Sequence, residues 1–185
     1  MFWQLFIQGD PGVGKSALII QFVQGIFVHD YTGLQEKTFT KQGKKGRLEL
    51  LEVDGSPQAV EIYNYLTTIK SCIMGVATVT AYSVSDKKSF ENAKGYLRTF
   101  KEKFGKHENA KQIIVATKCD CEMTREVSQL EGLQLAAECG HPFFETSSKI
   151  RTNVDELFEY IEEQLYATTL KVLVESKDKK ICRLS

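Results

Sequence analysis

Short hydrophobic runs alternate along the chain with longer segments in which hydrophobic residues recur every three or four positions. The short runs predict β-strands over residues 2–7, 38–42, 47–53, 76–82 and 112–116, and a shorter sixth run covers 141–145. The glycines and lysines of 43–46 predict a hairpin turn between the second and third strands. The longer segments predict helices that begin near Lys15, Asp86, Ser128 and Asn153. This alternation favours an α/β fold, a mainly parallel six-stranded sheet with helices on both faces.

Polar residues mark the ends of the predicted helices. Ser128 and Glu131 have the spacing of a capping box, and Gly140 is suited to end the helix that they begin. Asn153 and Glu156 are expected to cap the last helix. Helical spacing predicts the core face of this last helix, formed by Val154, Leu157, Phe158, Ile161 and Leu165.

Residues 9–16 read Gly-Asp-Pro-Gly-Val-Gly-Lys-Ser, the pattern of a phosphate-binding loop between a strand and a helix. The glycines let backbone N–H groups turn inward around a phosphate, and the helix directs its positive end to the same point. Lys15 adds a full positive charge, and the Ser16 hydroxyl is suited to bind Mg²⁺. The alternative is a glycine turn before a core helix. The residues predicted to hold the phosphates are Gly12, Val13, Gly14, Lys15, Ser16 and Ala17.

Two later loops carry residues suited to a guanine base. The carboxylate of Asp120 can accept hydrogen bonds from N1–H and the exocyclic amine of guanine, whereas adenine presents an acceptor there and leaves the carboxylate unpaired. The stem of Lys118 can cover the ring, and Phe27 can stack on its other side. In the loop Glu145-Thr146-Ser147-Ser148-Lys149, the N–H of Ser148 can meet the guanine O6. The predicted base site comprises Phe27, Thr117, Lys118, Asp120, Ser147, Ser148 and Lys149.

Composition and charge exclude several classes of protein. The 185 residues are 42% hydrophobic and 26% charged, which is ordinary for a soluble globular domain. The 24 basic and 24 acidic residues cancel, so no nucleic-acid partner is expected. No hydrophobic run approaches the ~20 residues of a membrane span. Five irregularly spaced cysteines indicate reduced thiols in the cytosol. We expect a monomer.

The segments GDPGVGKSAL, TKCD and ETSSK occur in the order and approximate spacing found in small GTPases. The chain resembles the Ras superfamily over roughly residues 3–168, with the Ras and Rap branch as the nearest. The resemblance implies a guanine-nucleotide-binding domain at 1–168, with GTP or GDP and Mg²⁺ bound, and slow GTP hydrolysis. It also implies a signalling switch that effector and exchange-factor proteins recognise. A nucleotide-binding scaffold with impaired hydrolysis and switching is the alternative, and the base motifs argue against a phosphate-loop kinase.

The family's second switch reads Asp-x-x-Gly followed by glutamine, and this chain fits that pattern in two registers. One register pairs Asp54 with Gln58, so that Asp54 holds Mg²⁺ through water and Gln58 orients the attacking water. The other keeps Gly55, makes Glu52 the acid and places Ser56 at the glutamine. The second register fits the flanking strand better, but the chemistry of the first favours Asp54 as the acid and Gln58 as the catalytic residue.

Other departures from the family lie where the γ-phosphate would bind. Leu34 stands at the position of the first-switch threonine, and Thr32 is two residues away. Pro11 replaces a glycine of the phosphate loop, and its ring is expected to crowd the place where an activating protein inserts an arginine. Thr117 replaces the usual asparagine of the base motif.

Residues 169–185 form a basic C-terminal tail that ends Cys182-Arg183-Leu184-Ser185. The Cys-x-x-Ser pattern fits a prenylation box, for which serine favours a farnesyl group on Cys182. Nearby lysines would supply the second signal that one lipid requires for stable attachment. The sequence therefore predicts a location at the cytoplasmic face of a membrane, with an ordinary solvated tail as the alternative.

Overall fold

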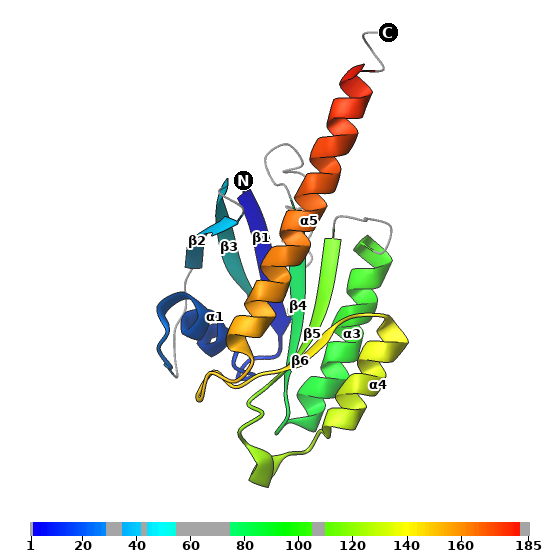
Figure 1. The fold of residues 1–185 in the computed structure, drawn as a ribbon. Helices are drawn as coiled ribbons and strands as arrows, with labels where there is room; N and C mark the ends of the chain where they lie inside the picture. The colour runs from blue at the N-terminus through cyan, green and yellow to red at the C-terminus, as the bar shows by residue number, and fades with distance from the viewer. Residues whose placement is uncertain (1, 29–34, 42–43, 55–74, 105–109, 182–185) are drawn as a thin grey trace.

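The computed structural model describes residues 2–28, 35–41, 44–54, 75–104 and 110–181. Their strands are β1 (Phe2–Gly9), β2 (Gln35–Lys41), β3 (Lys44–Asp54), β4 (Gly75–Ser83), β5 (Ala110–Thr117) and β6 (Phe143–Glu145). Their helices are α1 (Lys15–Gln24), α3 (Lys87–Phe104), α4 (Gln129–Cys139) and α5 (Val154–Ile181), with a short 3₁₀ helix η1 (Glu122–Thr124). The predicted α/β organisation is confirmed (Figure 1).

The six strands form one sheet in the order β2-β3-β1-β4-β5-β6. All neighbouring strands run parallel except β2, which is antiparallel to β3. β1 lies between β3 and β4, so the chain reverses its direction of travel across the sheet at this strand. Ligands of such sheets bind beyond the carboxyl ends of the strands, at the point of reversal. The loop that follows β1 occupies that point.

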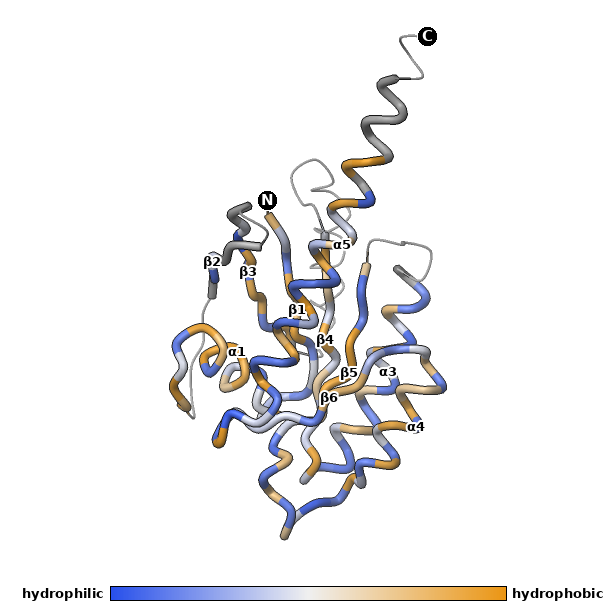
Figure 2. Tube along the Cα trace, in the orientation of Figure 1, coloured by the Kyte–Doolittle hydropathy of each residue, from blue (hydrophilic) through white to orange (hydrophobic). Residues whose placement is uncertain are grey.

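In the described part of the chain, helices cover both faces of the sheet, as the sequence predicted: α1 and α5 lie on one face, α3 and α4 on the other (Figure 1). On one face, alternate residues of β1 pack with α1 and α5, and they include Trp3, Leu5 and Ile7. On the other face, β4 and β5 contribute Tyr82 and Ile114 to a cluster with residues of α3 and α4. Hydrophobic residues are concentrated along the central strands (Figure 2). The predicted core face of α5 is confirmed, because all five of its residues are fully buried.

The observed ends of α4, α5 and the β2–β3 hairpin test the caps and the turn that the sequence predicted. The capping box of Ser128 and Glu131 is present, and Gly140 ends α4 in the left-handed conformation. Asn153 also precedes its helix but does not cap it as expected, because it has a φ of 53° and donates from Nδ2 to the Glu145 carbonyl at 2.8 Å. The predicted hairpin turn is too long, since β2 pairs with β3 up to Lys41 opposite Lys44.

Helix α5 continues past residue 168, where the sequence suggested that the domain gives way to a tail. The Trp3 indole N–H donates to the Thr169 hydroxyl at 2.8 Å, so contacts with the sheet extend into this part of the helix. Beyond it, α5 projects away from the sheet (Figure 1). No helix in the described part of the chain is both long and hydrophobic enough to cross a membrane.

Two helical glycines offer a matched test of the packing. A Cβ at Gly132 of α4 would lie 2.5 Å from Phe143 Cζ and 2.6 Å from the Tyr82 hydroxyl, whereas a Cβ at Gly95 of α3 would meet nothing within 4 Å. We expect Gly132→Ala to lower the free energy of unfolding by about 1–3 kcal/mol through overpacking. Gly95→Ala should raise it by about 0.5–1 kcal/mol. Urea denaturation of both variants measures these changes, and equal effects would contradict the packing described for α4.

Candidate nucleotide-binding site

The loop between β1 and α1 has the shape of a phosphate cradle. Gly12 and Gly14 have φ angles of 79° and 100°, values that L-residues with side chains rarely adopt. Gly9 is required for a different reason, because a Cβ there would lie 2.3 Å from the Ala81 carbonyl oxygen of β4. The turn that the glycines permit places the first N–H groups of α1 at the mouth of the loop, where the helix dipole favours an anion.

Lys15 lies inside this loop. Its side chain is only 3% exposed, and its ammonium group donates to the carbonyl oxygens of Gly9 and Asp10, both at 2.9 Å. The Glu52 carboxylate lies 3.6 Å from the same ammonium group. Phosphate oxygens are stronger acceptors for a cation than neutral carbonyls, so a nucleotide phosphate can compete for this group.

Residues of the β5 end hold the second half of the loop. Lys118 donates from Nζ to the Gly12 carbonyl at 2.7 Å. The buried hydroxyl of Thr117 lies 2.5 Å from the Val13 carbonyl and 2.9 Å from the Tyr82 carbonyl, and its one proton serves either acceptor. Thr117 therefore replaces the family's asparagine with a shorter group that still joins β5 to the phosphate loop.

The predicted Mg²⁺ side is formed by α1 and β3. The Ser16 hydroxyl donates to Glu52 Oε2 at 2.6 Å. Hydroxyl and carboxylate oxygens are suitable ligands for Mg²⁺, which is typically held by one or two carboxylates together with phosphates and waters. These contacts favour the register in which Glu52 is the acid. Of Asp54, the structure describes only the backbone, which pairs with Gly9, so its role stays a prediction.

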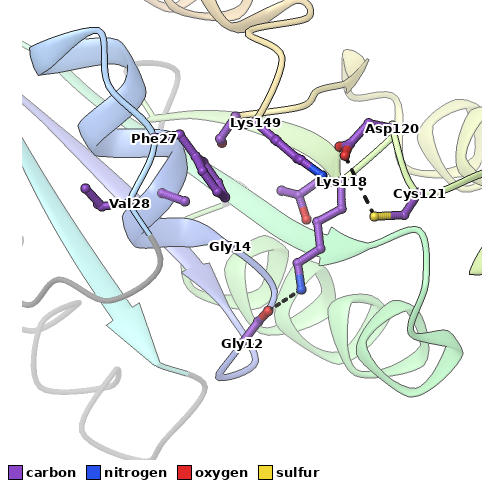
Figure 3. Close-up of a pocket in the computed structure, with 11 residues that line it drawn as sticks. Gly12, Gly14, Phe27, Val28, Lys118, Asp120, Cys121 and Lys149 are labelled. Carbon is purple, nitrogen blue, oxygen red and sulfur yellow. Dashed lines mark hydrogen bonds between the residues drawn. The ribbon is translucent and has the colours of Figure 1, made fainter.

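A cavity of about 370 Å³ opens beside the phosphate loop (Figure 3). Phe27 lies on one side of it, Lys118 and Asp120 on the other. Two lining residues, Val28 and Cys121, were not predicted from the sequence. The predicted residues that line it are Gly12, Gly14, Ala17, Phe27, Thr117, Lys118, Asp120, Ser148 and Lys149.

The other predicted residues take different positions. Val13 is buried in the core, Lys15 lies inside the loop, and Ser16 is bonded to Glu52. Ser147 is fully buried and donates to Asp120 Oδ1 at 2.5 Å, so it holds the carboxylate that the sequence predicts to bind the base. Gln58, Thr32, Leu34 and Cys182 lie outside the described residues.

Arg125 is a residue that the sequence reasoning missed. It makes paired hydrogen bonds with Glu145, at 2.9 and 3.2 Å, and with Glu122, at 3.0 and 2.7 Å, and donates to the Val127 carbonyl at 3.1 Å. Its two carboxylate partners raise the pKa of its guanidinium. Because Glu145 begins the Ser147–Lys149 loop, Arg125 fixes the two base loops to each other. The sequence offers one indication of this residue's role. Glu145 is a charged residue at the end of a buried strand, so it requires a cationic partner.

Cys119 and Cys121 flank Asp120. Burial and the nearby Glu145 raise the pKa of the Cys119 thiol, so this thiol is neutral at pH 7. The Cys121 thiol lines the cavity, 3.9 Å from Asp120 Oδ2.

The fold and this loop define a phosphate-loop nucleotide-binding protein, and comparison with known proteins gives the family. The family model described as Ras family matches residues 4–167. Ras-related protein Rab-13 of Canis lupus familiaris is 34% identical over 161 residues, covering 84% of this chain and 76% of that protein. Ras-related protein SEC4 of Candida albicans is 35% identical over 162 residues, covering 85% and 74%.

The chain therefore belongs to the Ras family of small GTPases, whose members are GTP hydrolases. This confirms the predicted superfamily, fold and enzyme class. The named relatives are of Rab type, so they give no support to the predicted place near the Ras and Rap branch.

Proposed function

We propose that the cavity and the adjoining loop bind GTP and GDP with Mg²⁺, and that the chain hydrolyses GTP slowly as a molecular switch. The observation that carries this proposal is the placement of Asp120. Its carboxylate lines the cavity, is held by the buried Ser147 hydroxyl and lies across from Phe27. A fixed carboxylate at this point suits the N1–H and amine of guanine and penalises adenine.

Different groups of the site would neutralise the phosphate charge, donate hydrogen bonds to the phosphates and bind Mg²⁺. Lys15 neutralises negative charge within the loop, and the α1 N-terminus supplies backbone N–H donors. Ser16 and Glu52 would hold Mg²⁺, which supplies charge neutralisation at the phosphate oxygens when bound. In the register that these contacts favour, Ser56 takes the glutamine's place, and serine cannot orient water in the same way. Slow hydrolysis follows from that substitution.

A second candidate is a scaffold that binds nucleotide without effective switching. Pro11 favours it, because this residue is exposed on the loop, where its ring narrows the approach of an inserted arginine. Single-turnover GTP hydrolysis, with and without an arginine-supplying activator, separates the two candidates. A chain that retains GTP indefinitely is a scaffold.

The base argument predicts that Asp120→Asn changes nucleotide preference. Xanthine has an acceptor where guanine has a donor, so the amide should bind xanthosine diphosphate and lose affinity for GDP by 10²-fold or more. Affinities of GDP, ADP and xanthosine diphosphate test this by competition with a fluorescent nucleotide. Glu91→Gln, on the exposed side of α3, is the control and should change none of them. Equal affinity of the unmodified protein for ADP and GDP would refute the assignment of Asp120.

The metal argument predicts different effects of two acidic residues. Glu52→Gln should remove most of the slowing of GDP release by Mg²⁺, roughly tenfold if one charged ligand is lost, whereas Asp54→Asn should remove less. Glu49→Gln, in the same strand but bonded to Gln4 instead, is the control. Release rates with Mg²⁺ and with a chelator measure the effect. The opposite ranking would restore Asp54 and Gln58 as the correct register.

Membrane attachment through Cys182 stays a prediction of the sequence, together with effector and exchange-factor partners. A farnesyl group on Cys182, supported by lysines such as Lys171 and Lys177, would place the protein at a cytoplasmic membrane face. In cell fractionation, Cys182→Ser should move the protein to the soluble fraction, and Cys139→Ser should not. If mass spectrometry finds no lipid on Cys182 of the unmodified protein, the anchor is absent.

A further inference from the structure

The side chain of Asp10 connects the phosphate loop to helix α3. Its Oδ2 accepts a hydrogen bond from Asn92 Nδ2 at 2.7 Å, and its Oδ1 accepts one from the Tyr96 hydroxyl at 2.5 Å. Asn92 and Tyr96 are four residues apart, so they lie one turn apart on the same side of α3. Hydrogen bonds to an ionised acceptor are about twice as strong as neutral ones.

The backbone of the same residue faces into the loop. The Asp10 carbonyl accepts the Lys15 ammonium at 2.9 Å and lies 3.5 Å from the Val13 N–H. Asp10 therefore joins two contacts that point in opposite directions, one to α3 and one to the cation that meets the phosphates. Any movement of Asp10 displaces an acceptor of Lys15.

Asp10 has no substitute within the loop. It is the one polar side chain among residues 9–14, where the others are glycine, proline and valine. The second half of the loop is held separately, by Lys118 at the Gly12 carbonyl and by Thr117 at the Val13 carbonyl. The first half has its side-chain anchorage at α3.

We propose that Asp10, Asn92 and Tyr96 are positioning residues that hold the phosphate loop in its nucleotide-binding shape and make nucleotide retention depend on α3. The inference rests on the proposed nucleotide site. The loop binds phosphates that are present in GDP, in GTP and in the transition state. The anchorage therefore stabilises the bound ground state and the transition state equally. Its loss therefore raises the rate of nucleotide release and leaves the hydrolysis rate of bound GTP unchanged.

The test is a double-mutant cycle on GDP release. Asn92→Ala should speed release of a fluorescent GDP about tenfold, the equivalent of one hydrogen bond to a charged group, and Asp10→Ala, which also loses the Tyr96 bond, should speed it by more. The double variant should release it no faster than Asp10→Ala, because both changes break the same contact. In Asn92→Ala, which leaves the loop sequence unchanged, single-turnover hydrolysis of bound GTP should stay within about twofold of the unmodified protein. Lys94→Gln breaks the neighbouring pair of Lys94 with Glu91 on the same helix and should change neither rate.

The outcomes separate this inference from the proposed function. If the unmodified protein retains GDP and the Asn92 and Asp10 variants release it at the same rate, the anchorage is structural only and the inference is overturned. The inference is also overturned if these variants have lower thermal stability but do not release GDP faster. Additive effects in the double variant would show that Asn92 acts on nucleotide by another route, which also overturns it. An unmodified protein that binds no guanine nucleotide overturns the proposed function, and this inference with it.

Discussion

Lys15 carries a positive charge into the interior of the protein, and the site is arranged around the compensation of that charge. An unpaired ammonium group at this depth would cost several kcal/mol. Two loop carbonyls and the Glu52 carboxylate prevent that cost. The carbonyls converge only because glycines let the backbone turn through positive φ, and the turn in turn directs the N–H groups of α1 to the same point. The shape of the loop and the position of its cation therefore depend on each other. A bound anion can take the place of the carbonyls, because it compensates the charge of Lys15 and accepts hydrogen bonds from the N–H groups of α1.

The parallel sheet supplies the rest of the site, because it brings the ends of β1, β3, β5 and β6 to one edge. What keeps these loops together is a set of charge-assisted bonds between them. Arg125 joins Glu122 to Glu145, Ser147 holds Asp120, and Lys118 crosses from the base loop to the phosphate loop. Except for the local pair of Arg125 with Glu122, these bonds link segments distant in sequence, so the base side of the site is fixed before any ligand arrives. Such preorganisation reduces the ordering cost of binding.

Hydrophobic periodicity and motif spacing predicted much of the fold and most of the cavity, since strands, helices and glycine loops are local in origin. What local patterns could not supply has a different origin. Glu52 and Asp54 are two residues apart in one strand, so the sequence allows two registers for the second switch. The contact of Ser16 with Glu52 favours one of them, and the role of Asp54 stays a prediction. Asn153 was assigned to a cap although its amide donates to the Glu145 carbonyl instead. The role of Arg125 could not be predicted from the sequence, because it comes from contacts with Glu122 and Glu145 in the folded chain and not from a motif.

Among the described residues, the departures from the family pattern are Pro11 of the phosphate loop and Thr117, which still holds that loop through the Val13 carbonyl. The base side retains its carboxylate, its lysine and its serines, with Asp120 held by Ser147 and Lys118 bonded to the Gly12 carbonyl. Pro11 lies on the phosphate side, and Asp10 ties this same side to α3. Base selection depends on hydrogen bonds that are complete in the ground state, whereas hydrolysis depends on groups that must meet a transferring phosphoryl group. Because different residues meet these two demands, a change on the phosphate side can alter the rate of hydrolysis without altering the proposed preference for guanine.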